Sequence, residues 1–402
     1  MTQRQFIGAV EIGTSKVVAL VGQLIGERSL NIIGLGQSTA VGVKKGEITD
    51  FRSVSNSTHA AISSAEKSAG VPIEGVYLSQ SGSHLAGFSN RGSVTVSSSS
   101  NVVRVEDIRR GVEEAKRKAL PQGRVFIHHV QCGFLLDGRA VEKPIGMRGD
   151  QIEVCYWHLH ADEKKISDHL HVINAYGVPV QDMIVSSIAS GSMIATESEK
   201  KHGVLVLDMG CGTTDYVLYR GGRILKTGVV GIGGDHFTND LSLGLRISAK
   251  QAEKLKLDFG KAEIDDSDKG DYVWLIGDLT IGDRPIPKLA IYKILNARAV
   301  ELFGILLKEF GPLLTADQVP AGVILTGGGS RMEGLISLGT SILGVTVRAG
   351  ENPLWVREDL RKPEYSTVLG LLHYGLTAQQ TETEENPSDG LMKKVARIFN
   401  LV

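Results

Sequence analysis

Two apolar segments flank a glycine-rich turn within residues 204–222. The run Val204–Leu207 is wholly apolar and predicts a short buried strand, which ends at the carboxylate of Asp208. Gly210 and Gly212 permit a tight turn in which backbone N–H groups can converge on an anion. A second apolar strand follows, and a pair of glycines closes it as a hairpin. The candidate phosphate-binding residues of this stretch are Gly210, Cys211, Gly212, Thr213 and Thr214.

The same arrangement occurs near the N-terminus. An apolar strand carries Glu11 near its end, a Gly-Thr turn follows, and a further apolar strand occupies residues 17–21. A third glycine-rich turn comes directly after the apolar residues 322–325. One such turn is commonly structural, but three that each follow a strand predict a nucleotide held between two related lobes. The candidates that these two turns add are Gly13, Thr14, Ser15, Lys16, Gly327, Gly328 and Gly329.

In this order the three turns resemble the phosphate-1, phosphate-2 and adenosine loops of the actin-like ATPase superfamily. Within it, Glu11–Lys16, Gly231–Asp235 and the C-terminal residues are similar to the FtsA family of bacterial cell-division proteins. The resemblance covers essentially the whole chain. It implies an α/β, actin-like two-lobed fold of duplicated ribonuclease-H-like domains, with an inserted FtsA-type subdomain called 1C.

The length of 402 residues allows two or more domains. The character of the sequence changes near His84, where strands and one strongly charged helix at 105–120 predict a compact insertion. The basic side of that helix is interpreted as a solvated face. The expected divisions are 1–83 with 164–200 for the first lobe core (1A), 84–163 for 1C, 201–245 with 306–376 for the second lobe core (2A), 246–305 for subdomain 2B, 377–390 for a disordered linker and 391–402 for an amphipathic helix.

The resemblance implies ATP and magnesium as ligands, and the residue types suit them. Lys16 and the Gly-Thr turns supply positive charge and donors for phosphate. Gly233 and Gly234 begin a predicted helix, and N–H groups at a helix N-terminus favour phosphate. Glu253 and Lys256 lie on one face of the next helix. In the superfamily such a pair contacts the adenosine, although the spacing fits a surface ion pair equally well.

Magnesium prefers oxygen ligands and retains several waters, so Glu11, Asp208 and Asp235 are expected to hold it through water. Actin-like hydrolases place a Gln or Glu on the helix that connects the lobes, and the matching stretch here, 185–190, contains neither. Asp208 could position water instead. The prediction is therefore tight ATP binding with weak or no hydrolysis. Cys211 stands where glycine is usual, and it is expected to weaken binding modestly.

Other functional classes would require sequence features that differ from those found here. A small-molecule kinase of the same superfamily is the alternative, but it needs a substrate cleft with an aspartate base and usually lacks a tail. A chaperone needs a substrate-binding domain, and only about thirty residues follow the closing helix at 367–374. A net charge of −1 provides no field that attracts nucleic acid. The three widely spaced cysteines, and the lack of a signal sequence or a membrane-spanning apolar run, favour a reducing cytosol.

A zinc site at Cys155, His158 and His160 is disfavoured. These residues alternate along a predicted strand, so Cys155 faces away from His158. The sequence also offers no second Cys/His pair at ligand spacing.

The C-terminal twelve residues predict a membrane-binding helix. At about 100° per residue, one face is apolar and the other basic or polar. Twelve residues are too few to cross a bilayer, but they suit a helix lying in its interface, with basic side chains on anionic inner-membrane lipids. The acidic, apolar-poor residues before it predict a disordered linker. The apolar residues are Leu391, Met392, Val395, Ile398, Phe399 and Val402, and the polar ones are Lys393, Lys394, Arg397 and Asn400.

The resemblance also implies partners and a location. An FtsA-like protein polymerises at the division site, on the cytoplasmic face of the cell membrane, and tethers the tubulin-like FtsZ ring there. The C-terminal peptide of FtsZ would bind near Arg298 and Glu301, although a solvated helix face explains these residues as well. Self-association into filaments and contacts with other divisome proteins are expected, and contacts with nucleic acid are not.

Overall fold

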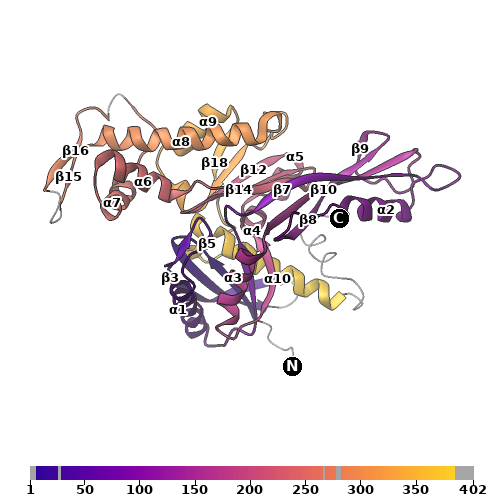
Figure 1. The fold of residues 1–402 in the computed structure, drawn as a ribbon, viewed down its shortest axis with the longest axis horizontal. Coiled ribbons are helices and arrows are strands. Elements are labelled where there is room, and N and C mark those ends of the chain that lie inside the picture. The colour runs from indigo at the N-terminus through magenta and orange to yellow at the C-terminus, as the bar shows by residue number, and fades with distance from the viewer. Residues whose placement is uncertain (1–5, 26–28, 266–267, 278–281, 385–402) are drawn as a thin grey trace.

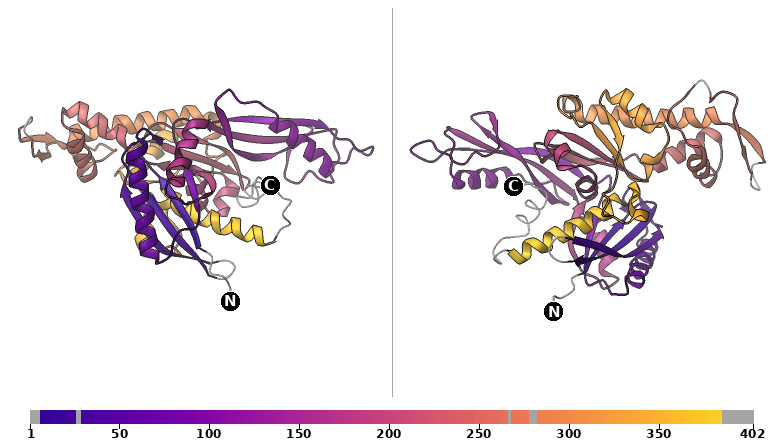
Figure 2. Two further views of the ribbon diagram at one scale, coloured as in Figure 1. Left: turned by 60° about the horizontal axis from the view of Figure 1, so that its bottom comes forward. Right: turned by 180° about the vertical axis from the view of Figure 1, so that it is seen from behind.

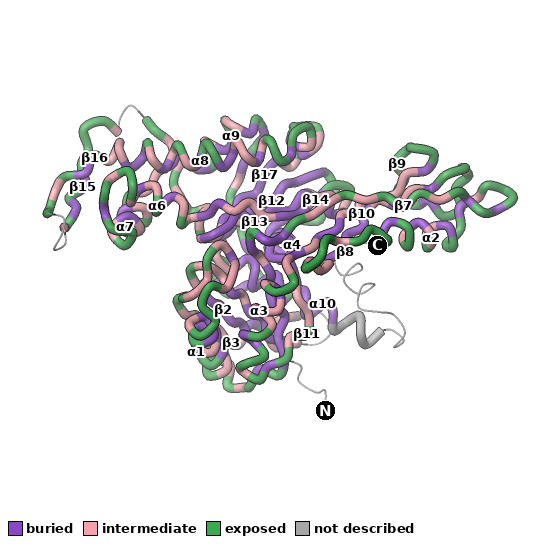
Figure 3. Tube along the Cα trace, viewed as in Figure 1, coloured by how far each residue is buried: buried purple, intermediate pink, exposed green. Residues whose placement is uncertain are grey.

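The structure, a computed structural model, describes residues 6–25, 29–265, 268–277 and 282–384. Two lobes lie one above the other, and an arm extends from them to each side (Figure 1). The arms point in opposite directions in the other views too (Figure 2). Buried residues concentrate in the central strands and between the lobes (Figure 3). None of the described helices is both long enough and apolar enough to span a membrane.

The lower lobe of Figure 1 is built on a five-stranded sheet with the order β11-β6-β1-β2-β3. Strands β1 to β3 form an antiparallel meander, whereas β6 runs parallel to β1 and β11 parallel to β6. Helix α1 packs on the sheet through a buried stripe that includes Val54, Ala61 and Ala65. The side chain of Asp50 caps the start of the helix, and Gly70, with φ +69°, caps its end. The elements are β1 (Phe6–Ile12), β2 (Lys16–Ile25), β3 (Ser29–Thr39), β4 (Val43–Lys44), β5 (Glu47–Ile48), α1 (Phe51–Ala69), β6 (Val76–Gln80), α3 (Glu163–Asn174) and β11 (Val180–Val185).

The upper lobe repeats this sheet with the order β14-β13-β12-β17-β18. Strand β12 pairs antiparallel with β13 and parallel with β17, as β1 pairs with β2 and β6. The hairpin predicted at Gly221 and Gly222 is present, and both glycines have positive φ. Helices α4 and α10 pack against each other between the lobes. The elements are α4 (Ser186–Ile194), α5 (Glu197–His202), β12 (Val204–Met209), β13 (Thr214–Arg220), β14 (Arg223–Val230), η2 (Gly311–Leu313), β17 (Val323–Thr326), η3 (Gly328–Arg331), α9 (Leu335–Leu343), β18 (Val347–Ala349), η4 (Glu358–Leu360), η5 (Pro363–Tyr365) and α10 (Ser366–Glu384).

Each arm is a small unit inserted into one lobe. The right arm of Figure 1 is a four-stranded antiparallel sheet, β7-β10-β8-β9, with α2 packed against β7 and β10. The left arm carries two helices, a long third helix and a two-stranded hairpin. The right arm contains β7 (Ala86–Thr95), α2 (Val105–Lys116), β8 (Arg124–Leu136), β9 (Arg139–Val141) and β10 (Gln151–Asp162). The left arm contains α6 (Gly234–Leu245), α7 (Ala249–Phe259), β15 (Tyr272–Leu275), β16 (Arg284–Pro287) and α8 (Lys288–Phe310).

The predicted start of the linker at residue 377 is wrong. Helix α10 continues to Glu384, so the part of the expected linker at 377–384 is helical. Helix α9 begins at Leu335, because Gly334 adopts a left-handed conformation directly before it. Helix α4 ends at Ile194, and a separate short helix α5 follows. The remaining linker and the whole expected membrane helix, 385–402, lie outside the described residues.

The close contact between α2 and β7 depends on two glycines. A Cβ atom at Gly92 would lie 1.8 Å from the carbonyl oxygen of Gly111, and one at Gly111 would lie 2.6 Å from Val154 Cγ2. We expect Gly92→Ala to destabilise the right arm by roughly 1–3 kcal/mol, because the helix must move away from the sheet. Gly304→Ala, in the interior of α8 with open space around its Cα, should instead stabilise by about 0.5–1 kcal/mol. Thermal unfolding of the two variants measures this, and an unchanged midpoint in Gly92→Ala would contradict the packing.

Candidate functional site

A cavity of about 620 Å³ lies between the two lobes. The turn between β1 and β2 and the turn between β12 and β13 both line it, as do the glycine turn after β17 and helix α7. The three turns predicted from the sequence therefore meet at one place. The predicted residues that line the cavity are Glu11, Gly13, Thr14, Ser15, Lys16, Asp208, Gly210, Cys211, Gly212, Thr213, Gly234, Glu253, Lys256, Gly327, Gly328 and Gly329.

Three predicted ligand-binding residues are not among the residues that line the cavity. Thr214 is buried in β13, and its hydroxyl donates to the carbonyl of Ile232 at 2.8 Å. Gly233 packs on the second phosphate turn, where a Cβ would lie 2.5 Å from the carbonyl oxygen of Cys211. Asp235 is exposed and accepts a hydrogen bond from the Cys211 thiol at 2.9 Å. Thr214 and Gly233 thus contribute to the packing around the turn, and Asp235 does not line the cavity with Glu11 and Asp208. A role for these three residues in ligand binding stays a prediction.

The Cys211 thiol is held in its protonated form. Burial raises its pKa to about 12, and the hydrogen bond to Asp235 and the charge of that carboxylate act in the same direction. The thiol is therefore a neutral donor at the cavity wall, and its sulfur adds no negative charge beside the phosphate turn.

Three carboxylates gather where the first strands of the two lobes end. Burial raises the pKa of Glu11 to about 8, which Lys16 opposes and the charges of Asp208 and Asp215 reinforce. Burial also raises the pKa of Asp215 to about 7, and the charge of Asp208 adds to the rise. The pKa of Asp208 is raised by burial as well, although a hydrogen bond from Thr367 opposes the change. The site therefore gathers acidic groups whose ionised forms are costly unless a proton or a cation offsets their charge.

The hydrogen bonds of these carboxylates differ. Asp208 accepts from the hydroxyl of Thr367 at 2.7 Å. Asp215 accepts from Ser81 Oγ at 2.7 and 2.8 Å, which is a contact between the two lobes. Glu11 Oε2 is buried and has no hydrogen-bond partner within the described part of the chain. Because a buried unpaired oxygen is costly, Glu11 favours a cation or donor close to it.

This arrangement fits a hydrated divalent cation better than a directly ligated one. Among the described residues, no group of three His, Cys, Asp or Glu side chains is placed to hold a metal ion by itself. Magnesium commonly keeps several waters and uses one or two carboxylates together with phosphate oxygens. Glu11 and Asp208 can serve in that way, and Asp215 replaces Asp235 as the third carboxylate at the cavity.

Apolar and paired charged side chains share another part of the cavity wall. Phe237, Leu257 and Met332 line it. Lys256 Nζ lies 2.7 Å from the carboxylate of Glu253 and donates to the carbonyl of Gly234 at 3.0 Å. The pair is thus an ion pair that forms part of the cavity wall, and its contact with an adenosine stays a prediction.

Comparisons with known proteins place the chain in a family. The family model for cell division protein FtsA matches residues 205–370, and the model for the SHS2 domain inserted in FtsA matches residues 82–158. The cell division protein FtsA of Pseudomonas aeruginosa is 32% identical over 400 residues, which cover 98% of this chain and 92% of that protein. The chain belongs to the FtsA family of cell-division proteins.

Further matches agree with this assignment. The FtsA of Neisseria meningitidis is 31% identical over 377 residues, covering 92% of this chain and 90% of that protein. Among solved structures, the PilM–PilN type IV pilus biogenesis complex matches with a TM-score of 0.65 and 18% identity, covering 92% of this chain and 98% of the other. MreB5 of Spiroplasma citri bound to ADP matches with a TM-score of 0.58 and 14% identity, covering 95% and 99%. These structures confirm the predicted actin-like fold.

Membership of the FtsA family also identifies the right arm. The match to the inserted SHS2 domain covers β7, α2, β8, β9 and most of β10, which confirms the predicted insertion near His84. The kinase alternative is not supported, because the matches over nearly the whole chain are to cell-division proteins. His158 in this FtsA-type insertion contacts His129 through the two Nδ1 atoms at 2.6 Å and Ala115 through its backbone oxygen at 3.0 Å, so it is a packed core residue.

The predicted partner residues lie away from the cavity, on the left arm. Arg298 in α8 forms two hydrogen bonds to the carboxylate of Asp240 in α6, at 2.6 and 2.8 Å. It also contacts Glu301 at 2.5 Å, and Glu301 is about half exposed. Any ligand of the Arg298 guanidinium would therefore compete with two carboxylates of the same chain.

Several cavity residues of this FtsA-family chain escape sequence reasoning. Asp215 has a usable signal, because the tight hairpin pairs it directly with Asp208. Ser81 and Tyr365 have no such signal in the sequence, because each is far along the chain from the glycine-rich turns with which it lines the cavity. The Lys16 ammonium lies over the ring of Tyr365, 4.1 Å from the ring centroid. This cation–π contact holds Lys16 against the cavity wall.

The raised pKa of Asp215 predicts how stability changes with pH. The folded state keeps the proton up to about pH 7, whereas an unfolded aspartate loses it near pH 4, so this group favours folding below about pH 4 and loses that contribution as the pH rises to 7. Asp215→Asn does not titrate. We therefore expect the unfolding free energy of the variant, relative to the unchanged chain, to rise between pH 4 and 7 by up to about 1.4 kcal/mol for each pH unit. Denaturant unfolding at several pH values measures it, and a constant difference would contradict the assignment.

Proposed function

We propose that the chain is an ATP-binding cell-division protein that assembles at the cytoplasmic face of the membrane, at the division site, and tethers an FtsZ polymer there. The observation that carries this proposal is the meeting of three glycine-rich turns, from both lobes, around a cavity large enough for a nucleotide. Membership of the FtsA family supports the cell-division role, and the residues of the cavity support ATP as the ligand.

The cavity offers what a nucleoside triphosphate needs. Backbone N–H groups of the two phosphate turns, together with Thr14, Lys16 and Thr213, can bind phosphate oxygens. Magnesium, held through water by Glu11 and Asp208, would offset the negative charge that phosphates bring to this acidic site. The related fold of MreB5 was solved bound to ADP and to AMPPNP, which supports the same use of this cavity.

Hydrolysis is proposed to be slow. Helix α4 begins at the cavity with Ser186, and its sequence SSIASGSMI contains no Gln or Glu that could orient a water. Asp208 remains a candidate for positioning water, but Thr367 holds one of its oxygens. Nucleotide binding, rather than turnover, would then control assembly.

A substitution at Gly327 tests nucleotide binding. Gly327 has φ +81°, and a Cβ there would lie 2.3 Å from Asp208 Oδ1. Gly327→Asp adds a clash and a like charge, so we expect ATP affinity in magnesium to fall at least tenfold, or about 1.4 kcal/mol, by titration calorimetry. Gly344→Asp is the matched control, because Gly344 also has positive φ but open space around it. Equal ATP affinities in the two variants would contradict the assignment.

Partner binding is proposed at the left arm. The FtsZ C-terminal peptide would contact α8 at Arg298 and Glu301, and it would have to displace Asp240 from the guanidinium. Self-association into filaments, and contacts with further divisome proteins, complete the proposed set of partners.

Membrane attachment is proposed for residues 391–402, on the strength of their sequence pattern. A basic amphipathic segment gains apolar burial in the interface and about 1 kcal/mol for each basic residue near anionic lipid. The acidic residues that separate it from the body favour this use over docking on the chain itself.

Liposome flotation tests the attachment. We expect the full chain to float with anionic liposomes, and a truncation after Asn386 to remain at the bottom. Phe399→Glu should abolish most of the binding, because it places a charge on the apolar face. Asn400→Glu makes the same charge change on the polar face and should retain more binding. If the truncated protein floats as well as the full chain, the anchor lies elsewhere.

A further inference from the structure

The right arm joins the lower lobe through two adjacent connections. The chain leaves the lobe through residues 81–85, between β6 and β7. It returns at Asp162, where β10 ends and the side chain of Asp162 caps the start of α3. A movement of the arm relative to the lower lobe must therefore displace these two connections. The arm also contacts β14 of the upper lobe, where Trp157 Nε1 donates to the carbonyl of Thr227 at 2.9 Å.

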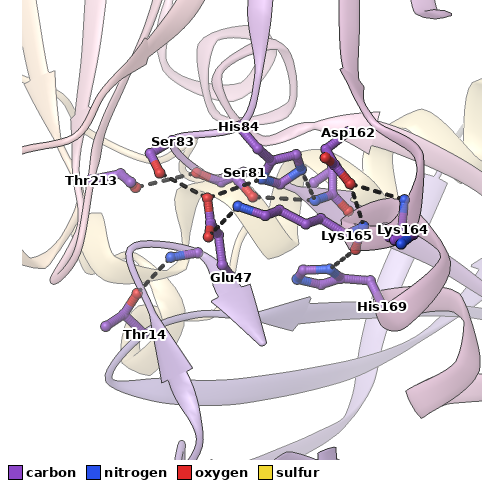
Figure 4. A network of polar contacts seen from close by, with 12 residues as sticks. Thr14, Glu47, Ser81, Ser83, His84, Asp162, Lys164, Lys165, His169 and Thr213 are labelled. Carbon is purple, nitrogen blue, oxygen red and sulfur yellow. Dashed lines mark hydrogen bonds and ion pairs between the residues drawn. The ribbon is translucent and has the colours of Figure 1, made fainter. Parts of the chain in front are cut away.

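Glu47 binds both connections at once (Figure 4). Its Oε1 accepts from Ser83 Oγ at 2.8 Å and lies 3.8 Å from His84 Nδ1, on the outgoing connection. Its Oε2 lies 2.5 Å from Lys165 Nζ, in the first turn of α3 on the returning connection. The Glu47 side chain is only 22% exposed, so both contacts are partly shielded from water.

Lys45 and Gly46, directly before Glu47, pack between the two phosphate turns, which are residues 12–16 and 208–215. Gly46 donates its N–H to Thr14 Oγ1 at 3.1 Å, in the first turn. A Cβ at Gly212, in the second turn, would lie 2.5 Å from Thr14 Oγ1 and 2.8 Å from Lys45 Cα. The two turns and residues 45–46 are therefore in contact, without space for independent movement.

The outgoing connection also contacts the same place. A Cβ at Gly46 would lie 2.7 Å from Gly82 Cα, and the N–H of Ser83 donates to the carbonyl of Lys45 at 3.3 Å. Ser81 Oγ lies 3.2 Å from Thr213 Oγ1 in the second phosphate turn. A continuous set of packed and hydrogen-bonded groups thus runs from both phosphate turns to both connections of the arm (Figure 4).

We propose that residues 45–47 are a relay that couples phosphate binding between the two turns to the orientation of the inserted arm. This proposal rests on the proposed nucleotide function, and it adds that the nucleotide site regulates the orientation of the arm. Phosphates held by both turns fix the separation of Thr14 and Gly212, and therefore the position of Gly46. Glu47 moves with Gly46 and carries Ser83 and Lys165 with it, so nucleotide binding and arm position bias each other.

Hydrogen–deuterium exchange of the full-length protein, with and without saturating ADP and magnesium, tests the relay. Two regions are compared: the phosphate turns, residues 12–16 and 208–215, and the arm connections, residues 81–86 and 160–166. The variants are Glu47→Gln, which keeps the shape of the side chain, and Lys165→Met. Lys164→Met is the matched control, because Lys164 is the exposed neighbour in the same turn of α3. The double exchange Glu47→Lys with Lys165→Glu restores an ion pair of reversed polarity.

We expect ADP to slow exchange at the phosphate turns in every protein. At the arm connections it should slow exchange in the unchanged chain, in Lys164→Met and in the double exchange, and this protection should be lost in Glu47→Gln and Lys165→Met. Two outcomes would overturn the relay and leave the nucleotide function standing. In one, ADP still protects the arm connections in both single variants; in the other, ADP protects the phosphate turns of the unchanged chain but not its arm connections. If ADP protects neither region of the unchanged chain, the nucleotide function fails and the relay fails with it.

Discussion

Three acidic side chains buried together between the two lobes are the constraint on which the rest of the site depends. Glu11, Asp208 and Asp215 are drawn together because the first hairpin of each lobe ends at the interface. Burial makes each carboxyl group prefer to hold a proton, which is why the pKa of each is raised, and the charge of Asp208 adds to the rise for Glu11 and Asp215. Lys16 offsets part of the charge but is itself partly buried, and its own pKa is lowered by that burial. The site is therefore acidic in excess, and it is chemically suited to a ligand that arrives with a divalent cation.

The duplicated sheet explains how one cavity acquires two similar walls. In each lobe a strand, a tight turn and an antiparallel return strand form the centre of the sheet, and a parallel strand follows on the far side. Small residues at the turns let the lobes approach until Gly212 lies against Thr14 and Lys45. A single methyl group at Gly212 would separate the walls, so the closeness of the lobes is set by backbone contact rather than by long side chains.

Sequence reasoning identified the turns because their signal is local. A run of apolar residues followed within a few positions by one or more glycines is visible in the sequence, and this pattern located Gly13, Gly210 and Gly327. Sequence reasoning failed where a residue that is distant in the sequence but close in the structure decides what a side chain does. Asp235 resembles a metal ligand in the sequence, but it does not line the cavity, and its Oδ1 accepts a hydrogen bond from the Cys211 thiol. Ser81 carries no motif, and its importance arises only because β6 ends opposite the second turn.

The position of the inserted arm follows from the same geometry. Strand β6 is the parallel neighbour of β1, so its C-terminal end must lie beside the first phosphate turn. An insertion placed directly after β6 therefore starts within one or two residues of the cavity between the lobes, whatever its own fold. The insertion returns at α3, which reaches Glu47 through Lys165. The connections of the arm are therefore part of the packing around the two turns, and the path between the cavity and the arm is short.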